Sequence, residues 1–133
     1  APVERLAQNL FICASTIAQQ AALACFHPES IAEYERRRAE FRARRDRVVP
    51  ALNRLGLSVP VEPDGAFYAY ADCSAHSANS WDFAFELMNR AHVALTPGRD
   101  FGRHDPQRWL RLSFASSQAK LDEALHRLQR VLA

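Results

Sequence analysis

The sequence predicts an α/β (α+β) fold in which helices cover a small mixed or antiparallel sheet of about 3–4 strands. Three features support this prediction. Apolar residues have helical spacing from residue 28 to about residue 55, short alternating runs follow up to residue 114, and a leucine stripe over Gln118–Leu132 closes the chain. From residue 28 the expected order is helix, strand, strand, helix, strand, strand, helix. A chain of 133 residues is long enough for one domain with an ordinary core.

The first 27 residues predict two helical pieces with a break near residues 13–15. Thr16 and Gln19 have the spacing of a capping box, which predicts that the second piece starts at Thr16. Glu4 and Arg5 are the only charged side chains in this segment. A helical segment so poor in charge normally packs against a large surface, so we expect it to be buried against another part of the protein.

Pro28 is expected to break the helical run, and a long helix is expected to follow it, to about Leu55 and Gly56. Ser30 and Glu33 have the spacing of a second capping box near its start. Pro50 lies inside the pattern and is expected to kink the helix or to end its main part, because proline lacks the N–H that a helix needs. The apolar stripe of this helix consists of Ile31, Tyr34, Phe41, Val48, Leu52 and Leu55.

Residues 36–47 carry the densest run of charge, RRRAEFRARRDR. Residues 29–55 contain eight arginines and five acids, a local excess of only three positive charges. Glu33 precedes Arg37 by four residues, and Glu40 precedes Arg44 by four, a spacing that lets acid and base pair on a helix. We therefore interpret the run as a solvated, salt-bridged helix face rather than as a nucleic-acid-binding helix.

Short strands and turns are expected after the long helix. Leu57–Val61 is the first predicted strand, and Pro63–Gly65 is a turn. Ala66–Ala71 (AFYAYA) is a predicted aromatic strand, and the small polar residues 72–79 form a loop. An amphipathic helix over Ser80–Ala91 follows. Its expected inward side chains are Phe83, Leu87 and Met88.

Two strands separated by a turn-rich loop are expected between residues 92 and 114. His92–Thr96 is the first, and Trp109–Phe114 is the second. In the second strand, alternate apolar residues form the core face, namely Leu110, Leu112 and Phe114. Arg111 therefore projects from the opposite face. It is either a solvated edge residue or the fixed end of an anion-binding site, because a guanidinium matches a carboxylate with two parallel hydrogen bonds.

Composition narrows the class of protein. The formal net charge of +2 is too small to imply a polyanionic partner, and 48% hydrophobic with 24% charged residues is the usual globular balance. Cys13, Cys25 and Cys73 fit no paired motif, and the scattered histidines suggest no metal site. The apolar N-terminal run contains four amide side chains and no signal-peptide pattern. These features predict a cytoplasmic protein without a membrane span.

Lys120 is the only lysine among 17 basic residues. A lysine that forms a Schiff base needs desolvation or a neighbouring cation. Lys120 instead has Asp122 and Glu123 beside it, so we expect an ordinary surface residue. The chain also lacks the GxSxG, P-loop and GxGxxG patterns, which argues against a self-contained hydrolase or nucleotide-binding enzyme.

Three motifs occur in order and with suitable spacing: PDGAFY at Pro63–Tyr68, VALTPG at Val93–Gly98 followed by Phe101-Gly102, and LRLSFA at Leu110–Ala115. Together they resemble the C-terminal part of class I/II, fold-type I, pyridoxal-phosphate-dependent aminotransferases. The resemblance covers nearly the whole chain. It implies a helical segment over residues 1–27 that leads from a large cofactor domain, and a small domain over residues 28–133.

The resemblance implies that Arg111 binds the substrate α-carboxylate and that Phe67 is a weaker candidate for the substrate pocket. It also implies pyridoxal phosphate in the full-length parent, an amino acid and a 2-oxo acid as substrates, and a homodimer. The family's Schiff-base lysine and its other cofactor-binding residues lie upstream of the matched region. The expected identity is thus a C-terminal fragment without catalytic, cofactor-binding or metal-binding residues of its own, which is inactive and binds no pyridoxal phosphate alone.

Two alternatives remain open at this stage. The chain could be the aminotransferase-like, ligand-sensing domain of a transcription regulator. A basic-helix nucleic-acid-binding domain is the third interpretation, and it depends only on the arginine run at residues 36–47.

Overall fold

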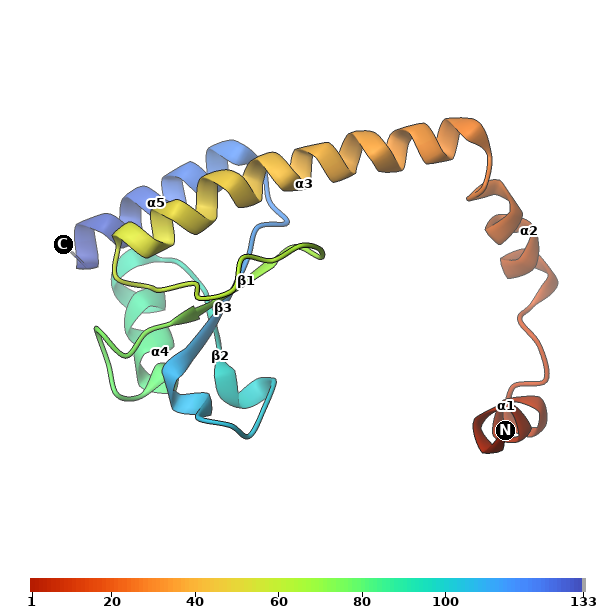
Figure 1. The fold of residues 1–133 in the computed structure, drawn as a ribbon, viewed down its shortest axis with the longest axis horizontal. Coiled ribbons are helices and arrows are strands. Elements are labelled where there is room, and N and C mark those ends of the chain that lie inside the picture. Colours follow the sequence, from red (N-terminus) through yellow and green to blue (C-terminus); the bar gives the residue numbers. More distant parts are fainter. Residues whose placement is uncertain (133) are drawn as a thin grey trace. The chain divides into compact units, whose positions relative to one another are not determined.

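The computed structural model describes residues 1–132; along the chain, helices precede and follow the residues that form a small sheet (Figure 1). The elements are α1 (Pro2–Leu10), α2 (Thr16–Ala24), α3 (Pro28–Arg54), β1 (Tyr68–Asp72), α4 (Ser80–Ala91), β2 (Thr96–Pro97), the 3₁₀ helices η1 (Gly98–Asp100) and η2 (Pro106–Arg108), β3 (Trp109–Ser113) and α5 (Gln118–Leu132). They form two compact units, Ala1–Ala39 and Glu40–Ala133. The boundary predicted between residues 27 and 28 separates a linking helical segment from a small domain. It is a different division from that of the two compact units, and it stays a prediction.

The sheet has three antiparallel strands in the order β1-β3-β2. Strand β3 is central, and Arg111 at its midpoint pairs with Tyr70 of β1 and Thr96 of β2. The predicted mixed α/β class with a small antiparallel sheet is confirmed. The register places Arg111 in the middle of the sheet rather than at an edge.

One face of the sheet is the core face. Ala69 and Ala71 of β1 and Leu110 and Leu112 of β3 are buried there, in agreement with the alternation in the sequence. Phe114, just after β3, is only 1% exposed. The opposite face carries the polar and aromatic partners of the same strands, including Arg111.

Three helical segments complete this core. Val48 and Leu52 come from the second half of α3, Leu87 from α4, and Leu121 and Leu128 from α5, and all belong to one buried cluster with the strands. Figure 1 shows α5 beside the second half of α3. Helices α4 and α5 have the bounds that the sequence predicts, Ser80–Ala91 and Gln118–Leu132.

Helices α1 and α2 have no buried residue. Large apolar side chains lie on their surface or in the adjoining turns, with Leu10, Ile17 and Phe26 between 69% and 85% exposed. The sequence predicts burial for this segment, but within residues 1–132 it does not occur. The arrangement leaves a strongly apolar surface on Ala1–Ala39.

Two of the predicted strands do not form as expected, and the first of them is Leu57–Val61. In Leu57–Val61 only Ser58 pairs, as an isolated bridge with Asp72, because neighbouring backbone donors are already engaged. The N–H of Leu57 bonds to the carbonyl of Leu52, and the N–H of Val59 bonds to the side chain of Asn53. The predicted strand over Leu57–Val61 is therefore wrong.

The predicted strand His92–Thr96 is also mostly wrong. His92 caps α4 in the left-handed conformation, with φ of 54°. The chain joins the sheet only at Thr96–Pro97. The strand propensity of these residues is overridden by the conformation of His92 at the end of α4.

The second helical piece starts at Thr16 as predicted, but the capping residues differ from those predicted. Ser15, not Thr16, caps α2, because its hydroxyl accepts a hydrogen bond from the Ala18 N–H at 3.3 Å. Helix α3 starts at Pro28, where the missing N–H of proline costs nothing, and Ser30 donates to the carbonyl of Ala24 instead. The helix also continues past Pro50 to Arg54.

Some predicted inward side chains are exposed. Met88 is 41% exposed, because the buried face of α4 follows Phe83, Ala84, Leu87 and Ala91. At the start of the long helix, Ile31 and Tyr34 are 45% and 46% exposed. The buried residues of α3 are Val48, Val49 and Leu52, which all lie in its later part.

Candidate functional site

Arg111 lies between two aromatic rings on the outer face of the sheet. Its Cζ atom is 4.3 Å from the centroid of the Tyr68 ring and 4.1 Å from the centroid of the Phe101 ring. Tyr68 comes from β1, and Phe101 comes from the loop between β2 and β3. A guanidinium over aromatic faces is attracted by their negative quadrupoles without using its N–H donors.

The Nε atom of Arg111 is buried and has no hydrogen-bond partner among the described residues. Within that part of the chain Arg111 also forms no ion pair. Leaving a buried donor unsatisfied costs about 1–3 kcal/mol. A carboxylate that binds through the Nε and Nη atoms would satisfy the donor, so the arrangement fits an anionic ligand with two parallel oxygens.

Aromatic contacts extend along the same face from Arg111. The Tyr70 ring meets Phe101 edge-on at 6.5 Å and stacks on Trp109 at 5.1 Å with an interplanar angle of 11°. Burial raises the pKa of Tyr70. Arg108 lies over the other end of the stack, 5.7 Å from the Trp109 centroid, and pairs with Asp72.

Asp72 is therefore already neutralised by its own partner. Burial raises the pKa of this carboxyl. Hydrogen bonds from Ser74 and Arg108 together lower it by more, so the net pKa is below its ordinary value. The carboxylate of Asp72 is thus paired with Arg108. Arg111 keeps its donors free.

The loop that carries Phe101 is packed tightly at its base. A Cβ atom on Gly98 would lie 2.5 Å from the carbonyl oxygen of Pro106, 2.7 Å from the Tyr70 hydroxyl and 2.9 Å from the Trp109 Cβ. Only glycine fits this approach without a shift of the backbone. The Phe101 N–H bonds to the Gly98 carbonyl at 2.9 Å, which closes the 3₁₀ turn and directs Phe101 back to the sheet.

Phe67, the weaker candidate for the substrate pocket, contacts a neighbour of Arg111. It is 36% exposed, and its ring is 4.2 Å from Tyr68 and 6.0 Å from Phe41 between centroids. Tyr68 contacts both the Phe67 ring and the guanidinium of Arg111. A role of Phe67 in a substrate pocket stays a prediction.

Lys120 is exposed in the first turn of α5. It borders a shallow pocket together with His92, Val93, Glu123 and other α5 residues, whereas Arg111 is not part of that lining. The surroundings are polar and open, and they do not desolvate the amine. The described residues therefore do not fit a lysine-linked cofactor.

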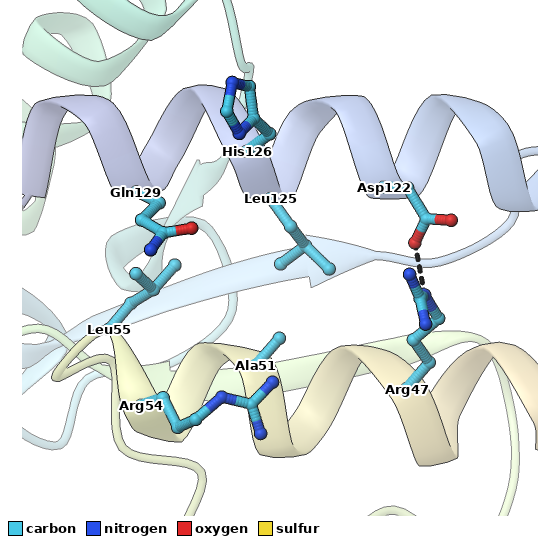
Figure 2. A pocket seen from close by; sticks show the side chains of 8 residues that line it. All are labelled: Arg47, Ala51, Arg54, Leu55, Asp122, Leu125, His126 and Gln129. Atoms are coloured by element: carbon cyan, nitrogen blue, oxygen red, sulfur yellow. Dashed lines mark hydrogen bonds and ion pairs between the residues drawn. The ribbon is translucent and has the colours of Figure 1, made fainter.

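A second groove lies between the end of α3 and α5, as Figure 2 shows. Arg47 and Asp122 form an ion pair across it, and Ala51, Leu55 and Leu125 supply apolar contacts. The groove is on the helical side of the core and does not include Arg111 or the aromatic rings. The contacts across this groove join α3 to α5, and the groove is separate from the arginine site.

The arginine run of α3 is largely paired with acids on its own helix. Arg36 and Arg37 bond to Glu33 at 2.7 Å, and Arg44 bonds to Glu40 at 3.1 Å. Hydrogen bonds from both arginines lower the pKa of Glu33 to about 2. The local geometry is that of a salt-bridged helix face.

Among residues 1–132, no helix is both long and apolar enough to cross a membrane. Over the same residues, His, Cys, Asp and Glu side chains form no group of three that could hold a metal. Cys13 and Cys25 are free and exposed, and Cys73 is free and buried.

Sequence reasoning identified Arg111 but missed Tyr68 and Phe101. The alternation in residues 66–71 carries a signal for Tyr68 and Tyr70, because it places both rings on the face opposite Ala69 and Ala71. Phe101 has no such signal. Its approach to Arg111 depends on the fold of the loop.

Comparison with known proteins agrees with this architecture. The family described as aminotransferase class I and II matches residues 3–128. The chain belongs to this family. The valine–pyruvate aminotransferase of Mycobacterium tuberculosis is 35% identical over 126 residues, which are 95% of this chain and 32% of that protein. The (5-formylfuran-3-yl)methyl phosphate transaminase of Methanocaldococcus jannaschii is 36% identical over 128 residues, 96% of this chain and 33% of that protein.

A solved aminotransferase structure from Mycobacterium tuberculosis superposes with a TM-score of 0.89 at 35% identity. The match covers 98% of this chain and 34% of that one. The chain thus spans about a third of the length of the aminotransferases it matches. The names of these two relatives specify different substrates, although both are aminotransferases.

Proposed function

We propose that Arg111 binds the α-carboxylate of the substrate in a pyridoxal-phosphate-dependent aminotransferase that transfers an amino group between an amino acid and a 2-oxo acid. The observation that carries the proposal is the buried, unpartnered Nε of Arg111. Family membership supplies the reaction class. The geometry supplies a cation that is fixed by a strand and keeps its donors free.

The chemical role of Arg111 is to bind and orient. Two parallel N–H···O bonds would hold the carboxylate in one plane, and the central strand would fix that plane in the protein. Fixing the carboxylate also fixes the adjacent Cα, whose bonds change in transamination. Pyridoxal phosphate would supply the electron sink for that change.

The remaining parts of the proposal concern the whole protein. We assign residues 28–133 to a small domain and residues 1–27 to the segment that leads into it. The cofactor lysine would come from outside this chain, because the setting of Lys120 does not suit that chemistry. The chain alone would then be inactive, and the complete enzyme would be a homodimer. The expected cytoplasmic location stays a prediction.

The test is kinetic and uses the full-length protein that contains this chain. Arg111→Leu should raise KM for every accepted amino acid by about a hundredfold, because the mispositioned carboxylate loses a charge-assisted pair of hydrogen bonds. Arg111→Lys should recover only part of the loss, since an ammonium cannot form the planar fork. The readout is KM over a panel of standard amino acids, with pyruvate and 2-oxoglutarate as acceptors.

Arg103→Leu is the matched control. Arg103 is exposed on the same loop region, so its removal changes the net charge by the same amount. KM should stay within a factor of about two in this variant, since an exposed charge contributes little. Unchanged kinetics in Arg111→Leu would remove the basis of the proposal.

A further inference from the structure

The contacts of Phe101 suggest a role beyond that of a surface aromatic residue. Its side chain is 46% exposed, so it adds little to the core. Its ring nevertheless lies 4.1 Å from the Cζ of Arg111 and meets Tyr70 edge-on at 6.5 Å. Phe101 therefore connects the loop between β2 and β3 to the centre of the sheet.

The way in which Arg111 is held bears on its donors. Several arginines of the chain, such as Arg108 with Asp72, are instead paired with carboxylates that accept hydrogen bonds from the guanidinium. Arg111 is held by the Tyr68 and Phe101 rings instead, and ring faces accept the charge without occupying the N–H groups. An aromatic clamp can thus fix the guanidinium and leave it available to a ligand.

The two sides of the clamp differ in their support. Tyr68 belongs to β1, which is hydrogen-bonded to β3 along its length. Phe101 depends on the loop, and the loop is fixed at its base by the close packing of Gly98 under Tyr70 and Pro106. The loop side is therefore the one that a substitution can remove without altering a strand.

We infer that Phe101 is a positioning residue that holds the Arg111 guanidinium between its own ring and that of Tyr68, so that the loop between β2 and β3 sets the affinity for the substrate carboxylate. This inference rests on the proposed function of Arg111. Phe101 acts through the arginine and does not itself bond to the carboxylate. Its effect is on binding rather than on the chemical step.

The experiment uses the full-length protein with Phe101→Leu, Phe101→Tyr and Phe85→Leu. Phe85 is a matched control, because it is 45% exposed and contacts Trp81 rather than Arg111. In Phe101→Leu, KM for amino acids and the inhibition constant of 3-phenylpropanoate should each rise about tenfold, with kcat within a factor of about two. Phe101→Tyr should restore both values because it keeps the ring, and Phe85→Leu should leave them unchanged.

A second readout does not depend on turnover. The Nε–H of Arg111 is buried, and removal of one ring should expose it, so its exchange with water should accelerate at least about tenfold in Phe101→Leu. The resonance can be assigned in ¹⁵N-labelled protein by its loss in Arg111→Lys. Accelerated exchange with restored protection in Phe101→Tyr supports the clamp.

The outcomes separate the two proposals. If Arg111→Leu leaves KM unchanged, the proposed function fails. If Arg111→Leu raises KM but Phe101→Leu changes neither KM nor Nε–H exchange, only the positioning role fails. A fall of kcat together with the melting temperature in Phe101→Leu, with KM constant, also overturns the inference, because it indicates a merely structural residue.

Discussion

Ser80 donates a hydrogen bond to the carbonyl oxygen of Pro106 at 3.0 Å. Ser80 is the first residue of α4 and is only 2% exposed, and Pro106 begins the 3₁₀ turn that leads into β3. The same carbonyl faces Gly98, where a Cβ atom would lie 2.5 Å away. One buried hydroxyl thus fixes the loop that carries Phe101 to the start of a helix.

Replacing Ser80 with alanine should lower the free energy of unfolding by about 1 kcal/mol, because the bond is lost while the Pro106 carbonyl still accepts from the Trp109 N–H. Urea unfolding followed by circular dichroism measures the change. Ser116→Ala, for which no side-chain hydrogen bond occurs among the described residues, should change stability by less than about 0.5 kcal/mol. Equal losses in both variants would show that the bond is not specific.

Gly98→Ala should destabilise the protein by about 1–3 kcal/mol, since three atoms lie within 3.0 Å of the added methyl group and one of them is a backbone oxygen. Gly65→Ala is the control, because no atom lies within 4 Å of its added Cβ. That control should be neutral or slightly stabilising through the unfolded state. The urea unfolding midpoints of the two variants, compared with that of the wild type, measure both changes. Equal midpoints for the two variants would contradict the close packing at Gly98.

The buried thiol of Cys73 predicts a loss of stability at alkaline pH. Burial, assisted by the charge of Asp72, raises the pKa of this thiol from 9.0 to about 11. The unfolded thiol ionises near pH 9, so the contribution is complete below pH 9 and is lost as the pH rises toward 11. The difference in unfolding free energy between wild type and Cys73→Ala should therefore shrink over this window. A constant difference would contradict the raised pKa.

The 133-residue chain alone should form no stoichiometric covalent adduct with pyridoxal phosphate. Lys120 is exposed and its surroundings do not desolvate the amine, so borohydride treatment should leave no cofactor on that residue beyond the level seen with free surface amines. Peptide mass spectrometry provides the measurement, with Lys120→Arg as the blank. Stoichiometric labelling of Lys120 would overturn the assignment of the cofactor lysine to another part of the protein.

Much of the fold could be predicted from local pattern. Helices α4 and α5 and strand β3 have strong periodicity, and their bounds or core faces were predicted correctly. The strands predicted at Leu57–Val61 and His92–Thr96 do not form over those ranges. In Leu57–Val61 the side chain of Asn53 takes a backbone donor from the ladder, a competition that composition does not reveal.

The site shows the same division between local and tertiary information. Arg111 could be predicted to leave the core face, because alternation in a strand fixes the side of each residue. The absence of an acid partner could not be predicted. It depends on Arg108 taking Asp72 and on the loop bringing Phe101 back, and both are tertiary contacts.

The aromatic clamp also has a consequence for competition at the site. Because rings rather than a carboxylate hold Arg111, no acid among residues 1–132 forms an ion pair that a ligand would have to break before it binds. Binding of a carboxylate at this arginine therefore needs no exchange of partners between charged side chains of the described residues.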